Sequence, residues 1–300
     1  IGSIEELKKE VSKSVSAGLM NKNTMTPDFD LHRPFIDDIT LVSSNGKPMY
    51  RETDLIDVWF DSGAMPFAQV HYPFENKNQI DNKTNYPADF IAEGVDQTRG
   101  WFFTLHAISV MLNDSVAYKN VVANGLVLDK DGNKMSKRLG NTIDPFMAVE
   151  KYGADAIRWY MLSNSAPWDN LKFDLDGVTE TQRKFFGTLH NTYGFYALYA
   201  NIDDFRNDHA EIPVKQRTEL DQWILSKLNS LSKLVEKAMD DYEPTMATRA
   251  IQSFVINDLS NWYVRLNRRR FWKGELTTDK IAAYQTLNSC LINVAKLMCS

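Results

Sequence analysis

The chain has 300 residues, of which 43% are hydrophobic and 24% charged, a balance typical of one large or two moderate globular domains. It contains no apolar run of the roughly 18 residues that a membrane-spanning helix needs. The two cysteines, Cys290 and Cys299, are too few for a disulfide framework or a zinc site, which favours a reducing, intracellular compartment, and we expect a cytoplasmic protein. The net charge of −5 divides into −8 over residues 1–180 and +3 over residues 181–300, which disfavours a broad polyanion-binding face in the first part.

The first residues of the chain are polar and weakly patterned. Residues 1–25 begin without an initiator methionine, and we expect a frayed helix or the tail of a neighbouring region there. Short extended segments follow around residues 39–42, with a turn at residues 44–47. Residues 73–87 are rich in Asn, Lys, Asp and Pro, which predicts a surface loop.

The next stretch alternates strand and helix patterns. Residues 90–92 and 121–128 are apolar and predict strands, while residues 101–112 and 145–162 have helical spacing. Asp144 is the expected N-cap of the second helix, with a proline at the first helical position. Strand, helix, strand and helix in this order predict a parallel α/β sheet.

From residue 180 onward the sequence predicts a helical bundle. Apolar residues recur at helical spacing over residues 220–242, and Pro244 ends that helix. A second stripe covers residues 246–266, and a third helix is expected over residues 280–298. The predicted fold class is therefore α/β plus all-α.

One candidate site lies where the first predicted strand meets the following helix. Residues 93–102 read Glu-Gly-Val-Asp-Gln-Thr-Arg-Gly-Trp-Phe. A carboxylate such as Glu93 can accept hydrogen bonds from ribose hydroxyls there, and Gly94 lets a nucleotide approach the backbone. The alternative is that Glu93 and Asp96 merely cap the helix, and the residues alone leave both open.

A second candidate site is the basic segment of residues 134–138, Lys-Met-Ser-Lys-Arg, between a predicted strand and a helix. The tight turn at residues 131–132 puts Lys134 and Lys137 on a loop at the carboxyl end of a strand, where open α/β sheets bind ligands. Two ammonium groups there can clamp a triphosphate and neutralise a leaving pyrophosphate. The alternative is a solvated basic turn, the commoner meaning of an isolated Lys-x-x-Lys.

A third candidate site is a cluster of arginines within two turns of the second bundle helix: Arg265, Arg268, Arg269 and Arg270. Arginine contacts phosphates and stacks on bases, which favours RNA as the partner of part of this cluster. The alternative is that the arginines pair with acidic residues of neighbouring helices. Trp262 and Tyr263 lie on the apolar stripe, so we expect both in the bundle core.

These segments resemble class I aminoacyl-tRNA synthetases. Residues 134–138 are similar to the Lys-Met-Ser-Lys-Ser signature of that class, with Arg138 in place of the final serine, a variation that the family allows. Residues 93–102 resemble the isoleucyl-tRNA synthetase pattern Glu-Gly-x-Asp-Gln-x-Arg-Gly-Trp-Phe, and residues 57–63, Asp-Val-Trp-Phe-Asp-Ser-Gly, match the same family. The likeness extends from about residue 30 to the end of the sequence.

The resemblance implies a nucleotide site. Lys134 and Lys137 are expected to contact the phosphates of ATP during amino-acid activation. Glu93 and Gly94 are expected to hold the ribose of the adenylate. The five histidines have no metal-ligand partner at usable spacing, so we expect no metal site.

The resemblance also implies an amino-acid site and an RNA partner. Asp96 and Gln97 are expected to orient the aminoacyl-adenylate, and Trp59 and Trp101 to wall the side-chain pocket, although Trp59 by itself is compatible with a packed core aromatic. A pocket of this kind separates isoleucine from valine by only roughly 1–3 kcal/mol, so the complete enzyme is expected to need editing.

The implied organisation is the C-terminal half of a Rossmann-like catalytic domain followed by a helical bundle. We expect residues 1–25 to be the trailing edge of an inserted editing region or a linker, residues 26–178 the catalytic half with the Lys-Met-Ser-Lys-Arg loop, and residues 179–300 part of a helical tRNA anticodon-binding domain. The family's His-x-Gly-His signature does not occur in the sequence, so we expect the chain by itself to be inactive.

The implied parent enzyme activates isoleucine with ATP and Mg²⁺ and transfers it to tRNA(Ile), with no membrane partner and no zinc in this chain. A valyl- or leucyl-type synthetase is the nearest alternative. A non-catalytic tRNA-binding relative is an alternative of another class.

Overall fold

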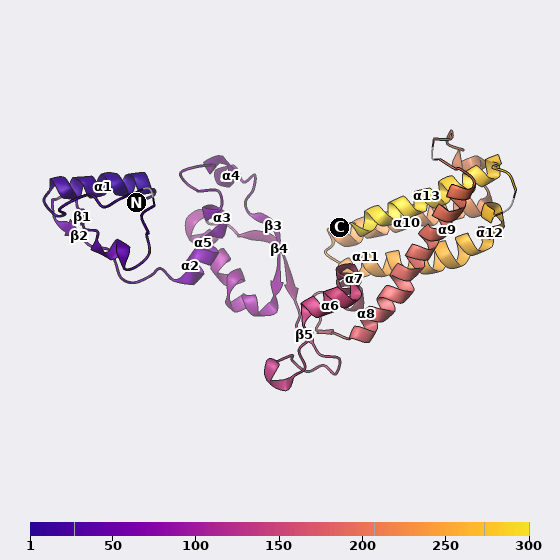
Figure 1. Cartoon of the computed structure of the whole chain (residues 1–300), viewed down its shortest axis with the longest axis horizontal. Helices are drawn as coiled ribbons and strands as arrows, with labels where there is room; N and C mark the ends of the chain where they lie inside the picture. Colours follow the sequence, from indigo (N-terminus) through magenta and orange to yellow (C-terminus); the bar gives the residue numbers. More distant parts are fainter. Residues whose placement is uncertain (27, 207, 273, 300) are drawn as a thin grey trace. The chain divides into compact units, whose positions relative to one another are not determined.

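The computed structural model describes all residues except 27, 207, 273 and 300, and it comprises two compact units, residues 1–65 and 66–300 (Figure 1). The first unit contains five elements: α1 (Ile4–Ser16), the 3-10 helix η1 (Phe35–Asp38), the antiparallel strands β1 (Leu41–Val42) and β2 (Pro48–Met49), and α2 (Val58–Gly63).

The first helix, α1, is regular and capped rather than frayed. The hydroxyl of Ser3 accepts a hydrogen bond from the backbone N–H of Glu6, which satisfies one unpaired donor of the first turn. Leu7 and Val11 are buried on its inner face against Ile39. The predicted extended segment and turn after it are confirmed as the β1–β2 hairpin.

The first part of the second unit holds two small parallel sheets, which confirms the predicted α/β organisation. β3 (Ala88–Gly94) pairs with β4 (Tyr118–Asn124), and β5 (Val127–Leu128) pairs with β6 (Leu171–Lys172). The helices α3 (Met65–Ala68) and α4 (Lys77–Asp81) precede β3. The 3-10 helix η2 (Val95–Arg99) and α5 (Trp101–Asn113) connect β3 to β4, and the 3-10 helix η3 (Lys137–Leu139), α6 (Pro145–Tyr152) and α7 (Ala154–Asn164) connect β5 to β6.

The strand predicted over residues 121–128 is in fact two strands in different sheets. The chain changes partner at Gly125, whose backbone N–H donates to the carbonyl oxygen of Pro167 at 2.8 Å. A Cβ at Gly125 would lie 2.3 Å from the carbonyl oxygen of Asp169, so only glycine allows this close approach of two backbones. The division therefore results from a tertiary contact that strand periodicity does not reveal.

The helix predicted over residues 145–162 is also divided. Gly153, with φ of 80°, ends α6, and α7 begins at the next residue. The predicted cap is confirmed, because the carboxylate of Asp144 accepts hydrogen bonds from the backbone N–H groups of Phe146 at 2.8 Å and Met147 at 3.3 Å. The predicted surface loop over residues 73–87 is wrong in part, since it includes α4 and two buried side chains, Ile80 and Tyr86.

The remaining elements form the predicted helical bundle. They are α8 (Leu175–Thr181), the π-helical segment η4 (Gln182–Phe186), α9 (Gly187–Ile202), the 3-10 helix η5 (Val214–Gln216), α10 (Glu219–Asp240), α11 (Pro244–Ser253), the π-helical segment η6 (Phe254–Val264), α12 (Arg265–Trp272) and α13 (Thr278–Met298). Their core is a single cluster that includes Ile224, Leu259, Tyr263 and Tyr284. In the described part of the chain, no helix has the length and apolar character that crossing a membrane requires.

The α/β part and the bundle meet where α7 packs on α11. The guanidinium of Arg249 donates to the carbonyl oxygens of Ser163 and Asn164, both at 2.7 Å, at the C-terminus of α7. The hydroxyl of Thr245 donates to the carbonyl oxygen of Ser165 at 2.9 Å. These bonds satisfy carbonyl groups that a helix end leaves without a partner.

Candidate functional site

The predicted ribose-binding residues lie at the shared carboxyl end of β3 and β4. Glu93 is opposite Ala123 and Gly94 opposite Asn124 in the parallel register. A Cβ on Gly94 would lie 2.5 Å from a carboxylate oxygen of Asp96, so a larger residue would displace that carboxylate. The edge where both strands end is the position at which ligands bind in parallel sheets.

The helix after this edge is capped by Gln97, whose side-chain oxygen accepts a hydrogen bond from the backbone N–H of Trp101 at 2.9 Å. Gly100, the residue before α5, has no side chain that could take this role. The ribose-binding role of Glu93 and the adenylate-orienting role of Asp96 stay predictions.

The Lys-Met-Ser-Lys-Arg segment has its lysines turned to solvent and its methionine turned inward. Lys134 and Lys137 are exposed, whereas Met135 packs against the small apolar cluster of Tyr160, Leu171 and neighbouring residues. Met135 also lines an apolar cavity of about 180 Å³. A loop anchored through Met135 presents both ammonium groups on its outer side.

The backbone beneath these lysines is shaped by two residues that we did not single out from the sequence, Asp129 and Asn141. Lys134 pairs with Leu128 in an antiparallel bridge, which folds the segment back on the end of β5. Asp129 then accepts the hydrogen bonds of the turn, and the amide of Asn141 bridges to it. Asp129-Lys-Asp-Gly-Asn is an Asx-turn sequence, and this signal could have identified Asp129.

The hydrogen bonds of this turn affect the charge of Asp129. The hydrogen bond from Asn141, together with those from the backbone at Asn133 and Asp131, holds the pKa of Asp129 below its ordinary value. Asp129 is therefore ionised at neutral pH beside a loop that carries exposed lysines.

The described residues contain no group of three or more His, Cys, Asp or Glu side chains that could hold a metal ion.

The two tryptophans predicted to wall a pocket lie in different units of the chain. Trp59 is on α2 of the first unit and is 48% exposed, so it is not a packed core aromatic. Trp101 is the first residue of α5 in the second unit and is half-buried. Their joint pocket remains a prediction.

Three of the four clustered arginines are exposed and one is held by carboxylates. Arg265, Arg268 and Arg269 face solvent. A guanidinium nitrogen of Arg270 lies 2.8 Å from a carboxylate oxygen of Asp221 and 2.8 Å from one of Asp279. Arg270 thus pairs with acidic residues of neighbouring helices, which was the alternative to RNA binding. The exposed Arg265, Arg268 and Arg269 could contact a polyanion.

The aromatics beside these arginines divide in the same way. Tyr263 is fully buried, as predicted, and its hydroxyl donates to Asp221 at 2.6 Å. Trp262, predicted in the core, is 59% exposed, because the π-helical segment η6 shifts the side-chain directions from those of an α-helix. An exposed tryptophan beside exposed arginines suits the stacking of a base.

The buried carboxylate at the centre of this arrangement is ionised. Burial by itself raises the pKa of Asp221, but the hydrogen bonds from Arg270 and Tyr263 outweigh burial and leave the pKa below its ordinary value. Burial by itself lowers the pKa of Arg270, but its hydrogen bonds to Asp221 and Asp279 raise that pKa above its ordinary value. Asp221 also completes a capping box with Thr218 at the start of α10, so one carboxylate joins α10, η6 and α12.

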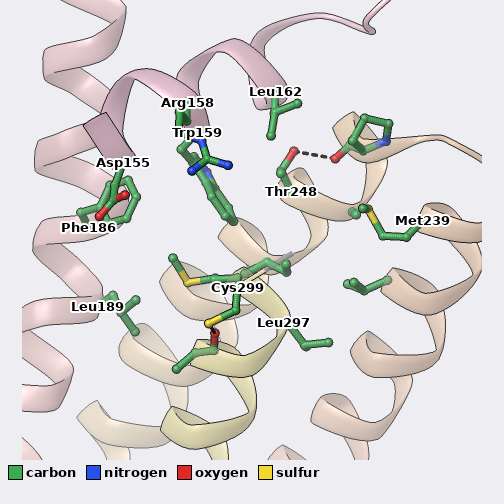
Figure 2. A pocket seen from close by; sticks show the side chains of 16 residues that line it. Asp155, Arg158, Trp159, Leu162, Phe186, Leu189, Met239, Thr248, Leu297 and Cys299 are labelled. Atoms are coloured by element: carbon green, nitrogen blue, oxygen red, sulfur yellow. Dashed lines mark hydrogen bonds between the residues drawn. The ribbon is translucent and has the colours of Figure 1, made fainter. Parts of the chain in front are cut away.

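An apolar cavity of about 470 Å³ lies apart from all of these residues, at the junction of α7 with the bundle (Figure 2). Figure 2 shows Trp159 on one side and Leu297 and Cys299 on the other, with the hydroxyl of Thr248 bonded to the carbonyl of Pro244 at 2.9 Å. None of the residues that line it belongs to the candidate motifs.

Two family models match the chain. The model described as tRNA synthetases class I (I, L, M and V) matches residues 3–174, and the model described as the anticodon-binding domain of tRNA ligase matches residues 221–299. The two matches cover the α/β part and most of the bundle.

Curated relatives and solved structures agree with these matches. The chain is 70% identical over 297 residues to an isoleucine–tRNA ligase of Cytophaga hutchinsonii and 63% identical over 312 residues to one of Bacteroides thetaiotaomicron. These alignments cover 99% of the chain but only 26% and 27% of the relatives, so the chain spans about a quarter of their length.

The similar solved structures share the fold at low sequence identity. One is the ternary LeuRS–tRNA–LeuAMS complex of Agrobacterium radiobacter K84, with a TM-score of 0.64 and 20% identity over 86% of the chain and 33% of that protein. Another is methionyl-tRNA synthetase of Mycobacterium tuberculosis bound by methionyl-adenylate, with a TM-score of 0.66 and 21% identity over 86% of the chain and 50% of that protein.

Proposed function

Because the chain belongs to the class I tRNA synthetase family (I, L, M and V), we propose that it supplies the C-terminal half of the adenylate-forming site of a cytoplasmic isoleucine–tRNA ligase. In this assignment residues 26–178 are the catalytic half, and residues 179–300 belong to the anticodon-binding part. The 70% identity to an isoleucine–tRNA ligase supports isoleucine over the valine and leucine alternatives.

The first step of the proposed reaction is amino-acid activation. The carboxylate of isoleucine attacks the α-phosphorus of Mg·ATP, the bond to the β-phosphate oxygen breaks, and isoleucyl-adenylate and pyrophosphate form. Glu93 and Gly94 hold the ribose, while Asp96 and Gln97 orient the aminoacyl-adenylate. The family resemblance assigns Trp59 and Trp101 to the amino-acid side-chain pocket.

The two lysines of the loop act on the leaving group. Negative charge accumulates on the pyrophosphate as the bond breaks, and the ammonium groups of Lys134 and Lys137 stabilise it. The observation that carries this proposal is their exposed placement on a loop anchored by Met135 at the end of β5. Catalysis by positioning and charge needs no covalent nucleophile.

The second step passes the isoleucyl group to the terminal ribose of tRNA(Ile). A ribose hydroxyl attacks the carbonyl carbon of the adenylate, and AMP leaves. Arg265, Arg268 and Arg269 then contact the tRNA backbone, since they are exposed in the part that matches the anticodon-binding model. Arg270 supports the helix that carries them.

The test is amino-acid-dependent exchange of pyrophosphate into ATP. The chain by itself is compared with a chimera in which it replaces the matching 297 residues of the Cytophaga hutchinsonii relative, with isoleucine, valine or leucine offered. We expect exchange by the chimera, strongest with isoleucine, and none by the chain alone because its sequence lacks His-x-Gly-His.

Other outcomes would redirect the proposal. A preference for valine or leucine would mean that the pocket belongs to a sibling enzyme. No exchange by a folded chimera that still binds tRNA would favour a non-catalytic tRNA-binding relative.

A further inference from the structure

The loop that carries Lys134 and Lys137 is organised around the carboxylate of Asp129, directly after β5. One carboxylate oxygen accepts hydrogen bonds from the backbone N–H groups of Asp131 at 3.0 Å and Asn133 at 2.7 Å. The backbone closes the same turn, with the N–H of Asp129 donating to the carbonyl of Asn133 at 2.9 Å. Asp129 thus fixes the start of the loop.

The other oxygen of Asp129 reaches across the loop to Asn141, twelve residues later. The side-chain N–H group of Asn141 donates to this oxygen at 2.9 Å. The same Asn141 accepts a hydrogen bond from the backbone N–H of Ser136 at 2.9 Å, in the middle of the lysine segment. One asparagine therefore connects both ends of the loop with its centre.

The hydrogen bond between Asp129 and Asn141, here called the bridge, lies beside the backbone that carries the two lysines. Ser136 precedes Lys137 and caps η3, since its hydroxyl accepts from the backbone N–H of Leu139 at 3.3 Å. The carbonyl oxygen of Lys134 lies 3.3 Å from the Asn141 side-chain nitrogen, which is a weaker contact. The side chain of Asn141 therefore contacts the backbone of Lys134 and of Ser136, the residue before Lys137.

We propose that Asp129 and Asn141 are positioning residues that fix the spacing and direction of Lys134 and Lys137 for the phosphates of ATP. This inference rests on the proposed function. The carboxylate and the amide act through the loop backbone and through each other, because these are the contacts they make. Their effect on activation arises because a charge displaced by about 1 Å from a reacting group can cost on the order of 100-fold in rate.

The geometry supplies a specific rescue variant. In Asp129→Asn, a side-chain amide replaces the oxygen that accepts from Asn141, so two N–H donors face each other. In the double variant Asp129→Asn with Asn141→Asp, the donor and acceptor exchange places, and the net charge of the loop is unchanged. A positioning role predicts partial recovery in the double variant, which a general loss of stability does not predict.

The matched control is Asp131→Asn. It removes the same charge from the same turn, but only the backbone of Asp131 takes part in the hydrogen bonds of the loop. Any effect of loop charge on ATP binding appears in both Asp129→Asn and Asp131→Asn. An effect of the bridge appears in the first alone.

The first measurement is amide hydrogen exchange of the 300-residue chain by mass spectrometry. We expect Asp129→Asn and Asn141→Ala to raise exchange in peptides covering residues 131–141 by about tenfold, with peptides of the bundle unchanged. Asp131→Asn should match the unsubstituted chain. This measurement needs no enzymatic activity, so it tests the bridge even if the proposed function fails.

The second measurement is pyrophosphate exchange in the Cytophaga hutchinsonii chimera. We expect Asp129→Asn to lower kcat by roughly 10- to 100-fold with the KM for isoleucine unchanged, Asp131→Asn to stay within about threefold, and the double variant to regain at least about fivefold. Equal losses in both single Asp variants, or an active chimera indifferent to Asp129→Asn, would overturn the inference. An unsubstituted chimera without exchange would instead overturn the proposed function.

Discussion

Lys137 and Lys130 belong to one loop, yet the backbone holds them differently. Lys137 begins η3 directly after Ser136, which caps that helix, whereas Lys130 lies at the exposed tip of the preceding turn. The sequence signature predicts a role for Lys137 but does not reveal which contacts hold its backbone. Only the fold shows that Asn141 contacts the residue beside it.

Substitution of these lysines gives a matched comparison. In the chimera, we expect Lys137→Ala to lower the kcat of pyrophosphate exchange by about 100-fold or more, because a preorganised group facing the developing charge is lost. Lys130→Ala removes the same charge from the same loop and should stay within about threefold. Similar losses in both variants would mean that the loop acts through general charge alone.

Gly125 is a position where the backbone itself prevents a side chain. The structure gives a Cβ there a distance of 2.3 Å from the carbonyl oxygen of Asp169. We expect Gly125→Ala to destabilise the chain by about 1–3 kcal/mol, measured as the urea midpoint. Gly194→Ala, in an exposed turn of α9 with open space, should instead stabilise it by up to about 1 kcal/mol. A neutral Gly125→Ala would show that the backbone at Gly125 and the turn at Asp169 can separate.

At the scale of elements, α10, η6 and α12 are joined through one buried carboxylate, Asp221. Sequence periodicity located these helices and part of their buried faces, although Trp262 and Leu266 on the second stripe are exposed. It could not distinguish Arg270, which is bound to Asp221, from Arg269, which faces solvent. It also placed Trp262 inside, because a 3.6-residue period does not describe the π-helical η6.

The two adjacent arginines should therefore respond in opposite ways. Arg270→Ala leaves Asp221 buried without its partner, which is expected to cost about 3–5 kcal/mol of stability in urea unfolding. Arg269→Ala should change stability by less than about 0.5 kcal/mol. In the chimera, Arg269→Ala should weaken tRNA binding and reduce its salt dependence. If Arg269→Ala destabilised the chain and Arg270→Ala weakened tRNA binding alone, the structural and RNA-binding roles of the two arginines would have to be exchanged.

The ionised Asp221 also gives the bundle a pH dependence. Its pKa in the folded chain is below the ordinary value of about 3.9, so its stabilising effect is present above that pH and is lost as pH falls through the lowered value. We expect the helical circular dichroism signal of the unsubstituted chain to persist to below about pH 4. In Arg270→Ala the loss should begin at a higher pH, because burial then raises the pKa unopposed. Coincident acid transitions would contradict this account.

At the scale of the whole molecule, the family resemblance and the strand–helix order predicted the fold class. The contacts that join its parts could be seen only in the structure. Arg249 is an example, since nothing in its helix pattern indicates that it caps α7 more than eighty residues earlier. Gly125 is another, because its contact is with a turn that a local pattern cannot locate. Long-range contacts of this kind leave no periodic trace in a sequence.

Removal of the Arg249 contact should loosen the connection between the α/β part and the bundle. We expect Arg249→Ala to lose two charge-assisted hydrogen bonds and about 1.5–3 kcal/mol, with calorimetric unfolding of residues 66–300 broadening or dividing into two transitions. Arg249→Lys keeps the charge but not the paired geometry and should be intermediate. A single sharp transition in Arg249→Ala would show that apolar packing alone joins them.

The inward side chain of Met135 has a consequence for the chemical durability of this protein. The loop rests on a thioether that is half-buried beside apolar side chains and a cavity of about 180 Å³. Oxidation to the sulfoxide would turn this contact into a polar, chiral group that the apolar cluster does not accommodate. Oxidation of Met135 by peroxide would thus remove the apolar contact that holds the lysine loop, while the bundle remained folded. Reduction of the sulfoxide by a methionine sulfoxide reductase would restore that contact.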